Sequence, residues 1–190
     1  MILPIYIYGH PVLRASNADV TPDYPGLQDL INNMKETMYH SQGIGIAAPQ
    51  VGVNIRLVYI DVDVLAEDMP ELKDRRMVLI NPTVTVDETA PTVTREEGCL
   101  SVPGIHENVT RREKIHLHWT DENGEQHDED IEGYLARVVQ HECDHLDQTL
   151  FIDRISPIRK QLIRSKLNNM VKGKVSCDYR VKVATHERRR

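Results

Sequence analysis

The chain has 190 residues, of which 40% are hydrophobic and 27% are charged, and its net charge is -6. These values predict one compact soluble domain with at most a tail, and the negative charge argues against nucleic acid as the main partner. No apolar run approaches the roughly 18 residues of a membrane span, and the N-terminal segment lacks the basic start of a secretory signal. The three scattered cysteines predict a reduced compartment, the cytoplasm, and no disulfide framework.

Apolar residues in the first quarter of the chain recur at helical spacing and predict a helix over about 25–40. The stretch Gly43–Gln50 follows, is punctuated by glycine, and has side chains too small for an ordinary strand. The charged segment 63–75 is expected to be a surface excursion. Hydrophobic and β-branched residues predict short strands at 56–62, 77–82, 83–87 and 92–96.

A hairpin is predicted in the second half of the chain. Residues 114–120 alternate between apolar and polar side chains, Asp121–Gly124 is a strong turn signal, and 125–131 returns as the partner strand. Residues 134–148 then read as a largely buried helix. Its apolar surface comes from Leu135, Val138, Val139 and Leu146.

Ser156 and Pro157 are expected to begin another helix, which continues at helical spacing to Val171 and ends at Gly173. Residues 174–190 are basic and weakly patterned, and they predict a loosely ordered tail. The expected fold class is α+β, with short antiparallel strands packed around a central buried helix and with N- and C-terminal helices.

The most informative stretch is His141-Glu142-Cys143-Asp144-His145, a HExxH pattern inside the helix predicted over 134–148. Positions i and i+4 of a helix differ by only about 40° around its axis, so both imidazoles lie on one face and can bind one transition metal. The glutamate between them can deprotonate a water that the metal activates. The stretch therefore predicts a metal-dependent hydrolase.

A catalytic site of this kind needs a third protein ligand. Metzincins continue as HExxHxxGxxH, but Gln148 occupies the place of that glycine and no third histidine follows. Thermolysin-like enzymes use a downstream glutamate, and Glu187 in the basic tail is the only one after the motif. Upstream, Cys99 follows a glycine in a loop-like stretch and can complete a Cys-His-His site. Cys143 is the local rival, but it lies about 200° around the helix from the first histidine and is expected to be a small core residue.

Three stretches together resemble the peptide deformylase family. Gly43–Gln50 matches its glycine-hydrophobic-glycine-hydrophobic-Ala-Ala-x-Gln motif, Glu97–Ser101 matches Glu-Gly-Cys-Leu-Ser, and Gln140–Leu146 matches Gln-His-Glu-x-x-His with Asp and Leu in the usual places. Their order and spacing match as well, over roughly residues 1–170. The resemblance implies one metallohydrolase domain over 1–173 that removes the N-formyl group from the initiator methionine of new polypeptides and releases formate.

The resemblance also implies a role for each site residue. Glu142 moves the proton of the attacking water to the leaving amine. The Gln50 side-chain amide and the Leu100 backbone N–H donate to the developing oxyanion. Glu97 is expected to pair with Arg111 as scaffolding. The ligands of one divalent metal are Cys99, His141 and His145.

Substrate binding follows from the same resemblance. Gly45 presents backbone groups to an extended peptide, which binds like an added strand. Ile44, Tyr134 and Val138 are candidate walls of the methionine pocket. The expected partners are N-formylmethionyl nascent peptides. The basic C-terminal segment permits contact with the ribosome surface, as in some relatives, and neither direct nucleic-acid recognition nor a membrane is expected.

The metal is not fixed by the ligand types, because thiolate plus imidazole suits zinc, cobalt, nickel or ferrous iron. The ligand chemistry alone favours zinc. Members of the peptide deformylase family, which this chain resembles, use ferrous iron for full activity. The resemblance therefore implies Fe2+ as the metal in the cell. Zn2+, Ni2+ or Co2+ can occupy the purified protein.

Two other functions remain open on the residues alone. HExxH also suits a zinc endopeptidase, although the missing downstream ligand argues against it. The second alternative is a structural metal protein without catalytic activity, in which Cys143 fills the open position and completes a closed site of four ligands. One departure from the family pattern is Gln148, which stands where the family usually has glycine. It removes no catalytic group, and it is expected to alter the helix exit.

Overall fold

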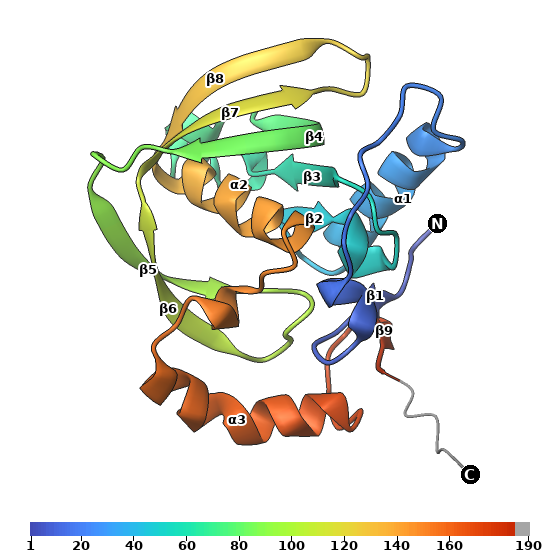
Figure 1. Ribbon diagram of the computed structural model, residues 1–190, viewed down its shortest axis with the longest axis vertical. Helices are drawn as coiled ribbons and strands as arrows, with labels where there is room; N and C mark the ends of the chain where they lie inside the picture. Colours follow the sequence, from blue (N-terminus) through green and yellow to red (C-terminus); the bar gives the residue numbers. More distant parts are fainter. Residues whose placement is uncertain (185–190) are drawn as a thin grey trace.

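The computed structural model describes residues 1–184, and it has the predicted α+β fold (Figure 1). An antiparallel sheet of five strands, in the order β2-β3-β4-β7-β8, lies at the top of the view. Its strands are β2 (Gly45–Ala47), β3 (Leu57–Asp61), β4 (Arg76–Val86), β7 (Lys114–Thr120) and β8 (Gln126–Glu132).

Helix α2 (Gly133–Leu146) lies beneath this sheet and carries the HExxH stretch (Figure 1). Its side chains Leu135, Val139 and Leu146 recur at helical spacing and join the inner face of the sheet in one buried cluster. Burying each such side chain contributes about 1.5–3 kcal/mol, so the sheet fixes which face of α2 points away from it. The predicted central helix is therefore confirmed, and it ends before the predicted position 148.

A hairpin of β5 (Thr92–Gly98) and β6 (His106–Arg112) lies on the opposite side of α2 from the sheet (Figure 1). The sequence predicted a strand at 92–96 but missed β6. The buried positions of β6 are Glu107, Val109 and Arg111, so charged residues occupy the inward face and hide the usual alternation. They are tolerated because each has a partner, as in the ion pair between Arg159 and Glu107 at 2.8 Å.

Strand β4 is one long strand where the sequence predicted two, at 77–82 and 83–87. Its pairing with β7 shifts register between Ile80 and Thr83. Asn81 lies in this irregularity and has a φ of 50°. Pro82 follows it, and its missing backbone N–H is tolerated because the pairing is already interrupted at this point. The proline therefore interrupts the ladder without ending the strand.

The segment 43–50 was expected to be unlike an ordinary strand, yet residues 45–47 form the edge strand β2. The strand is only three residues long, and a 3-10 helix follows it directly. The charged segment 63–75 is irregular, as expected, apart from two short 3-10 helices. The 3-10 helices are η1 (Pro11–Arg14), η2 (Ala48–Val51), η3 (Asp63–Leu65), η4 (Pro70–Leu72) and η5 (Phe151–Asp153).

Two further helices lie where the sequence predicted them. Helix α1 (Leu27–His40) buries Ile31, Met34 and Met38. Helix α3 (Pro157–Val171) begins at Ser156, whose hydroxyl accepts a hydrogen bond from the Arg159 backbone N–H at 3.3 Å. No helix within residues 1–184 has the length and apolar character needed to cross a membrane.

Within the segment 174–190, which was predicted to be a loosely ordered tail, residues 181–182 form a short strand. Strand β9 (Val181–Lys182) pairs in parallel with β1 (Ile5–Tyr6), and the Ile5 N–H donates to the Arg180 carbonyl at 2.8 Å. The burial of this segment has a period of two, in which half-buried residues alternate with exposed ones, and this alternation is typical of a strand. The half-buried residues are Val175, Cys177, Tyr179, Val181 and Val183. Residues 185–190 of the predicted tail lie outside the described residues.

Candidate active site

A cleft with a volume of ≈ 780 Å³ lies where β2, α2 and the end of β5 meet. His145 is buried and does not line it. All the other predicted site residues do, and they are Ile44, Gly45, Gln50, Cys99, Leu100, Tyr134, Val138, His141 and Glu142.

The donor atoms of Cys99, His141 and His145 lie within 4.8 Å of one another. The Cys99 Sγ is 3.3 Å from the His145 Nε2. The helical spacing of the two histidines holds their rings 5.4 Å apart, and the loop after β5 brings the thiol to them. Burial lowers the pKa of His145 well below its usual value, which favours the neutral imidazole that a metal needs. One sulfur and two ring nitrogens fit a divalent transition metal.

Buried charges hold His141 in place. The His141 Nδ1 lies 2.9 Å from the Glu97 carboxylate, which leaves its Nε2 free to bind a metal. Arg111 forms two hydrogen bonds to Glu97, at 2.6 and 2.9 Å, so the predicted pairing is confirmed. Arg137 adds another at 2.7 Å. Burial alone would raise the pKa of Glu97, but the bonds from His141 and Arg111 hold it well below its usual range.

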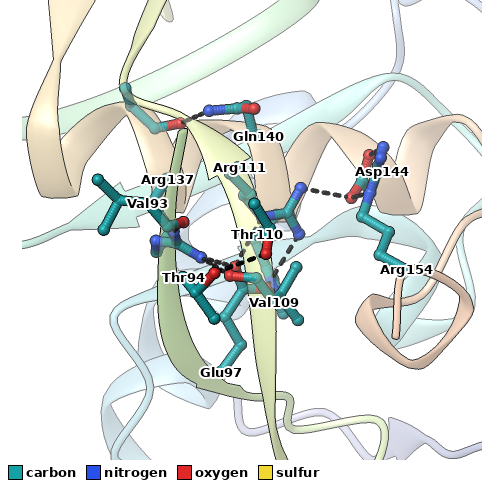
Figure 2. Close-up of polar contacts among 12 residues, drawn as sticks. Val93, Thr94, Glu97, Val109, Thr110, Arg111, Arg137, Gln140, Asp144 and Arg154 are labelled. Carbon is teal, nitrogen blue, oxygen red and sulfur yellow. Dashed lines mark hydrogen bonds and ion pairs between the residues drawn. The ribbon is translucent and has the colours of Figure 1, made fainter. Parts of the chain in front are cut away.

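The same network continues to the far end of α2 (Figure 2). Arg111 also donates to Asp144 at 2.9 Å, and Arg154 donates to Asp144 at 2.6 Å. The sequence interpretation missed Arg137, Asp144 and Arg154. A signal was present, because charged residues on a helix predicted to be buried must find partners. The network ties the β5–β6 hairpin to the helix that carries the two histidines.

Glu142 lies beside the candidate metal ligands and is buried. Its Oε2 atom has no hydrogen-bond partner among the described residues. Burial raises the pKa of Glu142 to about 7. A carboxylate that lines a cleft and has a pKa near neutrality can accept a proton and give it back in the same reaction.

Gln50 is held so that its amide nitrogen faces the cysteine. Its Oε1 accepts a hydrogen bond from the Ala47 backbone N–H at 2.8 Å. Its Nε2 then donates to the Ser101 hydroxyl at 3.2 Å and lies 3.5 Å from the Cys99 sulfur. Leu100 follows Cys99 in the same loop, so two candidate donors for an oxyanion lie beside the ligands.

Comparison with known proteins decides the family. The family model described as polypeptide deformylase matches residues 2–161. The chain is 45% identical over 189 residues to the peptide deformylase of Christiangramia forsetii, covering 96% of each chain. It is 46% identical over 183 residues to that of Salinibacter ruber, covering 94% of this chain and 93% of the relative. The chain belongs to the peptide deformylase family.

The solved structures agree with the sequence comparison. The crystal structure of a peptide deformylase from Legionella pneumophila superposes with a TM-score of 0.79 at 36% identity, covering 92% of this chain and 98% of that one. The family membership predicted from three motifs and the α+β fold predicted from the pattern of strands and helices are therefore confirmed.

Gln148, the departure from the deformylase pattern, adopts a φ of 57°. Glycine is common at such positions because other residues pay a steric penalty in the left-handed region. Arg14 holds the strained turn, since it donates to the Gln148 carbonyl at 2.6 Å and pairs with Asp153 at 2.6 Å. Gln148 thus lies at the helix exit and does not line the cleft.

Replacing Gly45 with alanine is expected to lower kcat for deformylation about 100-fold with little loss of stability. A Cβ atom on Gly45 would lie 2.5 Å from the Glu142 Oε1 and 2.8 Å from its Cδ, so the carboxylate must move. The Gly45 backbone does not require glycine, because its φ is not positive. Steady-state kinetics and urea unfolding of the metal-loaded protein measure both effects.

Gly124 provides the opposite control. Its φ is 82° and a Cβ there would meet no atom within 4 Å, so Gly124→Ala is expected to cost about 1 kcal/mol of stability and no activity. Full activity of the Gly45 variant would show that Glu142 tolerates displacement, against the role assigned to it.

Proposed function

We propose that this chain hydrolyses the N-formyl group of N-formylmethionyl polypeptides and releases formate, with Glu142 as its proton carrier. The observation that carries the proposal is the unpartnered Glu142 carboxylate oxygen, buried in a cleft beside a Cys-His-His donor set. Family membership supports the same reaction. We infer that residues 1–173 form the metallohydrolase domain.

The reaction needs a metal and three further groups of the chain. Cys99, His141 and His145 would hold a divalent metal, which would supply Lewis-acid chemistry by acidifying water and polarising a carbonyl group. Glu142 accepts a proton from the attacking water as the new C–O bond forms. It then delivers that proton to the amine nitrogen as the C–N bond breaks. Such proton transfer contributes about 10²- to 10⁴-fold to the rate.

The formyl oxygen gains negative charge while the water adds. We assign its stabilisation to two donors, the Gln50 Nε2 and the Leu100 backbone N–H. Donors that are already oriented gain most from the developing charge, and one of them contributes about 10²- to 10³-fold. The hydrogen bonds that fix the Gln50 amide support this assignment, because they remove the need to reorient it during the reaction.

The substrate is proposed to bind at the edge of the five-stranded sheet. β2 is the edge strand, so one side of it is available to pair with an extended peptide. Gly45 lies on this strand and allows Glu142 close to it. The methionine side chain is placed against Ile44, Tyr134 and Val138, which line the same cleft.

We propose Fe2+ as the metal in the cell, with Zn2+, Ni2+ or Co2+ able to occupy the purified protein. We also propose that the enzyme works in the cytoplasm, where nascent chains are made. The three unpaired thiols at Cys99, Cys143 and Cys177 support a reducing compartment.

The test is formate release from a formyl-Met-Ala peptide by protein loaded with Fe2+ without oxygen. The matched control substrate is acetyl-Met-Ala, which carries one more methyl group on the same amide. Rapid formate release with little acetate release is expected. Cleavage of the Met-Ala bond instead would indicate an endopeptidase, and no release from fully loaded protein would indicate a structural metal site.

Helix α3 supports a further proposal, that the protein contacts the ribosome surface. Ile158 and Leu162 lie one turn apart on α3 and are 75% and 65% exposed. The exposed basic residues Arg164 and Lys166 lie on the same helix and suit an anionic surface.

Replacing both Ile158 and Leu162 with glutamate is expected to reduce co-sedimentation with ribosomes at least 10-fold, because it removes apolar contact and adds charge of the wrong sign. Val64→Glu is the control, since Val64 is 62% exposed on a different element. Formate release from a free peptide should be unchanged in both variants. Equal co-sedimentation of all three proteins would contradict the assignment of α3.

A further inference from the structure

The peptide group that joins Leu100 to Ser101 is held by a hydrogen bond at each end. Its carbonyl oxygen, on Leu100, accepts from the Tyr179 hydroxyl at 2.8 Å. Its N–H, on Ser101, donates to the Cys99 sulfur at 3.4 Å. Because a peptide group is planar, the two bonds together fix the orientation of one rigid unit.

Tyr179 reaches this loop from a distant part of the chain. It lies on the segment between α3 and β9, and Cys177 and Tyr179 of this segment line the cleft. The segment is anchored beyond Tyr179, where the Ile7 N–H donates to the Lys182 carbonyl at 3.0 Å. The N-terminal segment holds the same loop, because the Tyr8 N–H donates to the Ser101 carbonyl at 2.8 Å.

A hydrogen bond to the carbonyl of a peptide polarises the whole group. Its N–H then becomes a better donor, because linked hydrogen bonds strengthen one another. The Tyr179 hydroxyl therefore strengthens the bond from the Ser101 N–H to the Cys99 sulfur. A hydrogen bond to a ligand sulfur withdraws electron density from it and tunes any metal that it holds. The same bond restrains Leu100, whose own N–H we assigned to the oxyanion.

We propose that Tyr179 is a positioning residue for deformylation, which orients the Leu100–Ser101 peptide and thereby the thiolate ligand, and which restrains Leu100, the residue whose N–H is the oxyanion donor. The C-terminal segment is thus part of the catalytic architecture, although Tyr179 itself touches no reacting atom. The proposal rests on the function proposed above, since it assigns a support to two groups of that mechanism.

Tyr179→Phe removes the hydroxyl and keeps the ring. It is expected to lower kcat about 5-fold while KM for formyl-Met-Ala changes less than about 2-fold, because the lost bond orients groups used in the chemical step. In the Co2+-loaded protein, the thiolate-to-cobalt charge-transfer band is expected to shift, because the sulfur loses part of its hydrogen bonding. Tyr24→Phe is the matched control, since Tyr24 packs at the edge of the cluster around α1.

The outcomes separate this proposal from the one on which it rests. An unchanged kcat and an unchanged cobalt band in Tyr179→Phe would overturn the positioning role. A change in KM alone would also overturn it and make Tyr179 a wall of the cleft. Failure of the native protein to release formate would instead sink the proposed function, and the cobalt band would still report on the Tyr179 bond. Equal thermal stability of both variants excludes general unfolding.

Discussion

Glu142→Gln is expected to lower the rate of formate release about 1,000-fold while the protein still binds its metal. Glutamine has nearly the same shape as glutamate but cannot carry the proton between water and amine. The metal content should stay the same, because the ligands are assigned to the neighbouring side chains. Stability should stay the same or rise, because a buried carboxylate oxygen without a partner is costly.

The control for this result is Glu67→Gln, which makes the same chemical change at an exposed position. Both variants are loaded with Fe2+ under the same conditions, and their metal content, kcat and unfolding midpoint are measured. More than a tenth of the native kcat in the Glu142 variant would remove it as the proton carrier. Loss of metal would make it a ligand and require a different site.

Arg111→Met is expected to destabilise the protein by about 3–5 kcal/mol. Arg111 is buried and bonds to both Glu97 and Asp144, so its removal leaves two buried carboxylates short of a partner. Methionine fills much of the volume but replaces none of the three hydrogen bonds. Urea unfolding of the metal-loaded protein measures the loss.

The next residue along β6 supplies the control. Arg112 is partly buried, donates to the Ala90 carbonyl at 2.8 Å, and pairs with Glu88, whose carboxylate is 79% exposed and can be solvated when the arginine is removed. Arg112→Met is therefore expected to cost less than about 1 kcal/mol. Equal losses in the two variants would show that the buried network contributes no more than a surface pair. The scaffold role assigned to Glu97 and Arg111 would then be wrong.

The sequence alone supplied the helical part of the site. The spacing of His141 and His145 predicts a shared face for both imidazoles, and the structure has them there. Cys99 is distant in sequence; the search for a third ligand made it a candidate, and the resemblance to a family connected it to the histidines. No local pattern encodes such a contact, because it depends on how the β5–β6 hairpin packs against α2.

Among the strands that escaped prediction, β6 and β9 did so for different physical reasons. β6 has Glu107 and Arg111 on its buried face, so a search for alternating apolar residues finds nothing there. Those charges are stable only because of partners elsewhere in the fold, which the local sequence does not show. In the segment that ends in β9, the alternation was present, but the basic composition suggested a solvated tail. Giving the alternation at Val181 and Val183 more weight than the basic composition would have predicted β9.

The pairing of β1 with β9 joins residues 5–6 to residues 181–182. Closing a loop that spans nearly the whole described chain has a high entropic cost, so this contact is expected to form after the local helices and hairpins. Among the described elements, β9 is also the last to be synthesised, and β1 stays unpaired until then. The loop that holds Cys99 depends on both segments, through Tyr8 and Tyr179. A folding chain would thus assemble its histidines early and acquire a fully ordered catalytic loop only when its two ends meet.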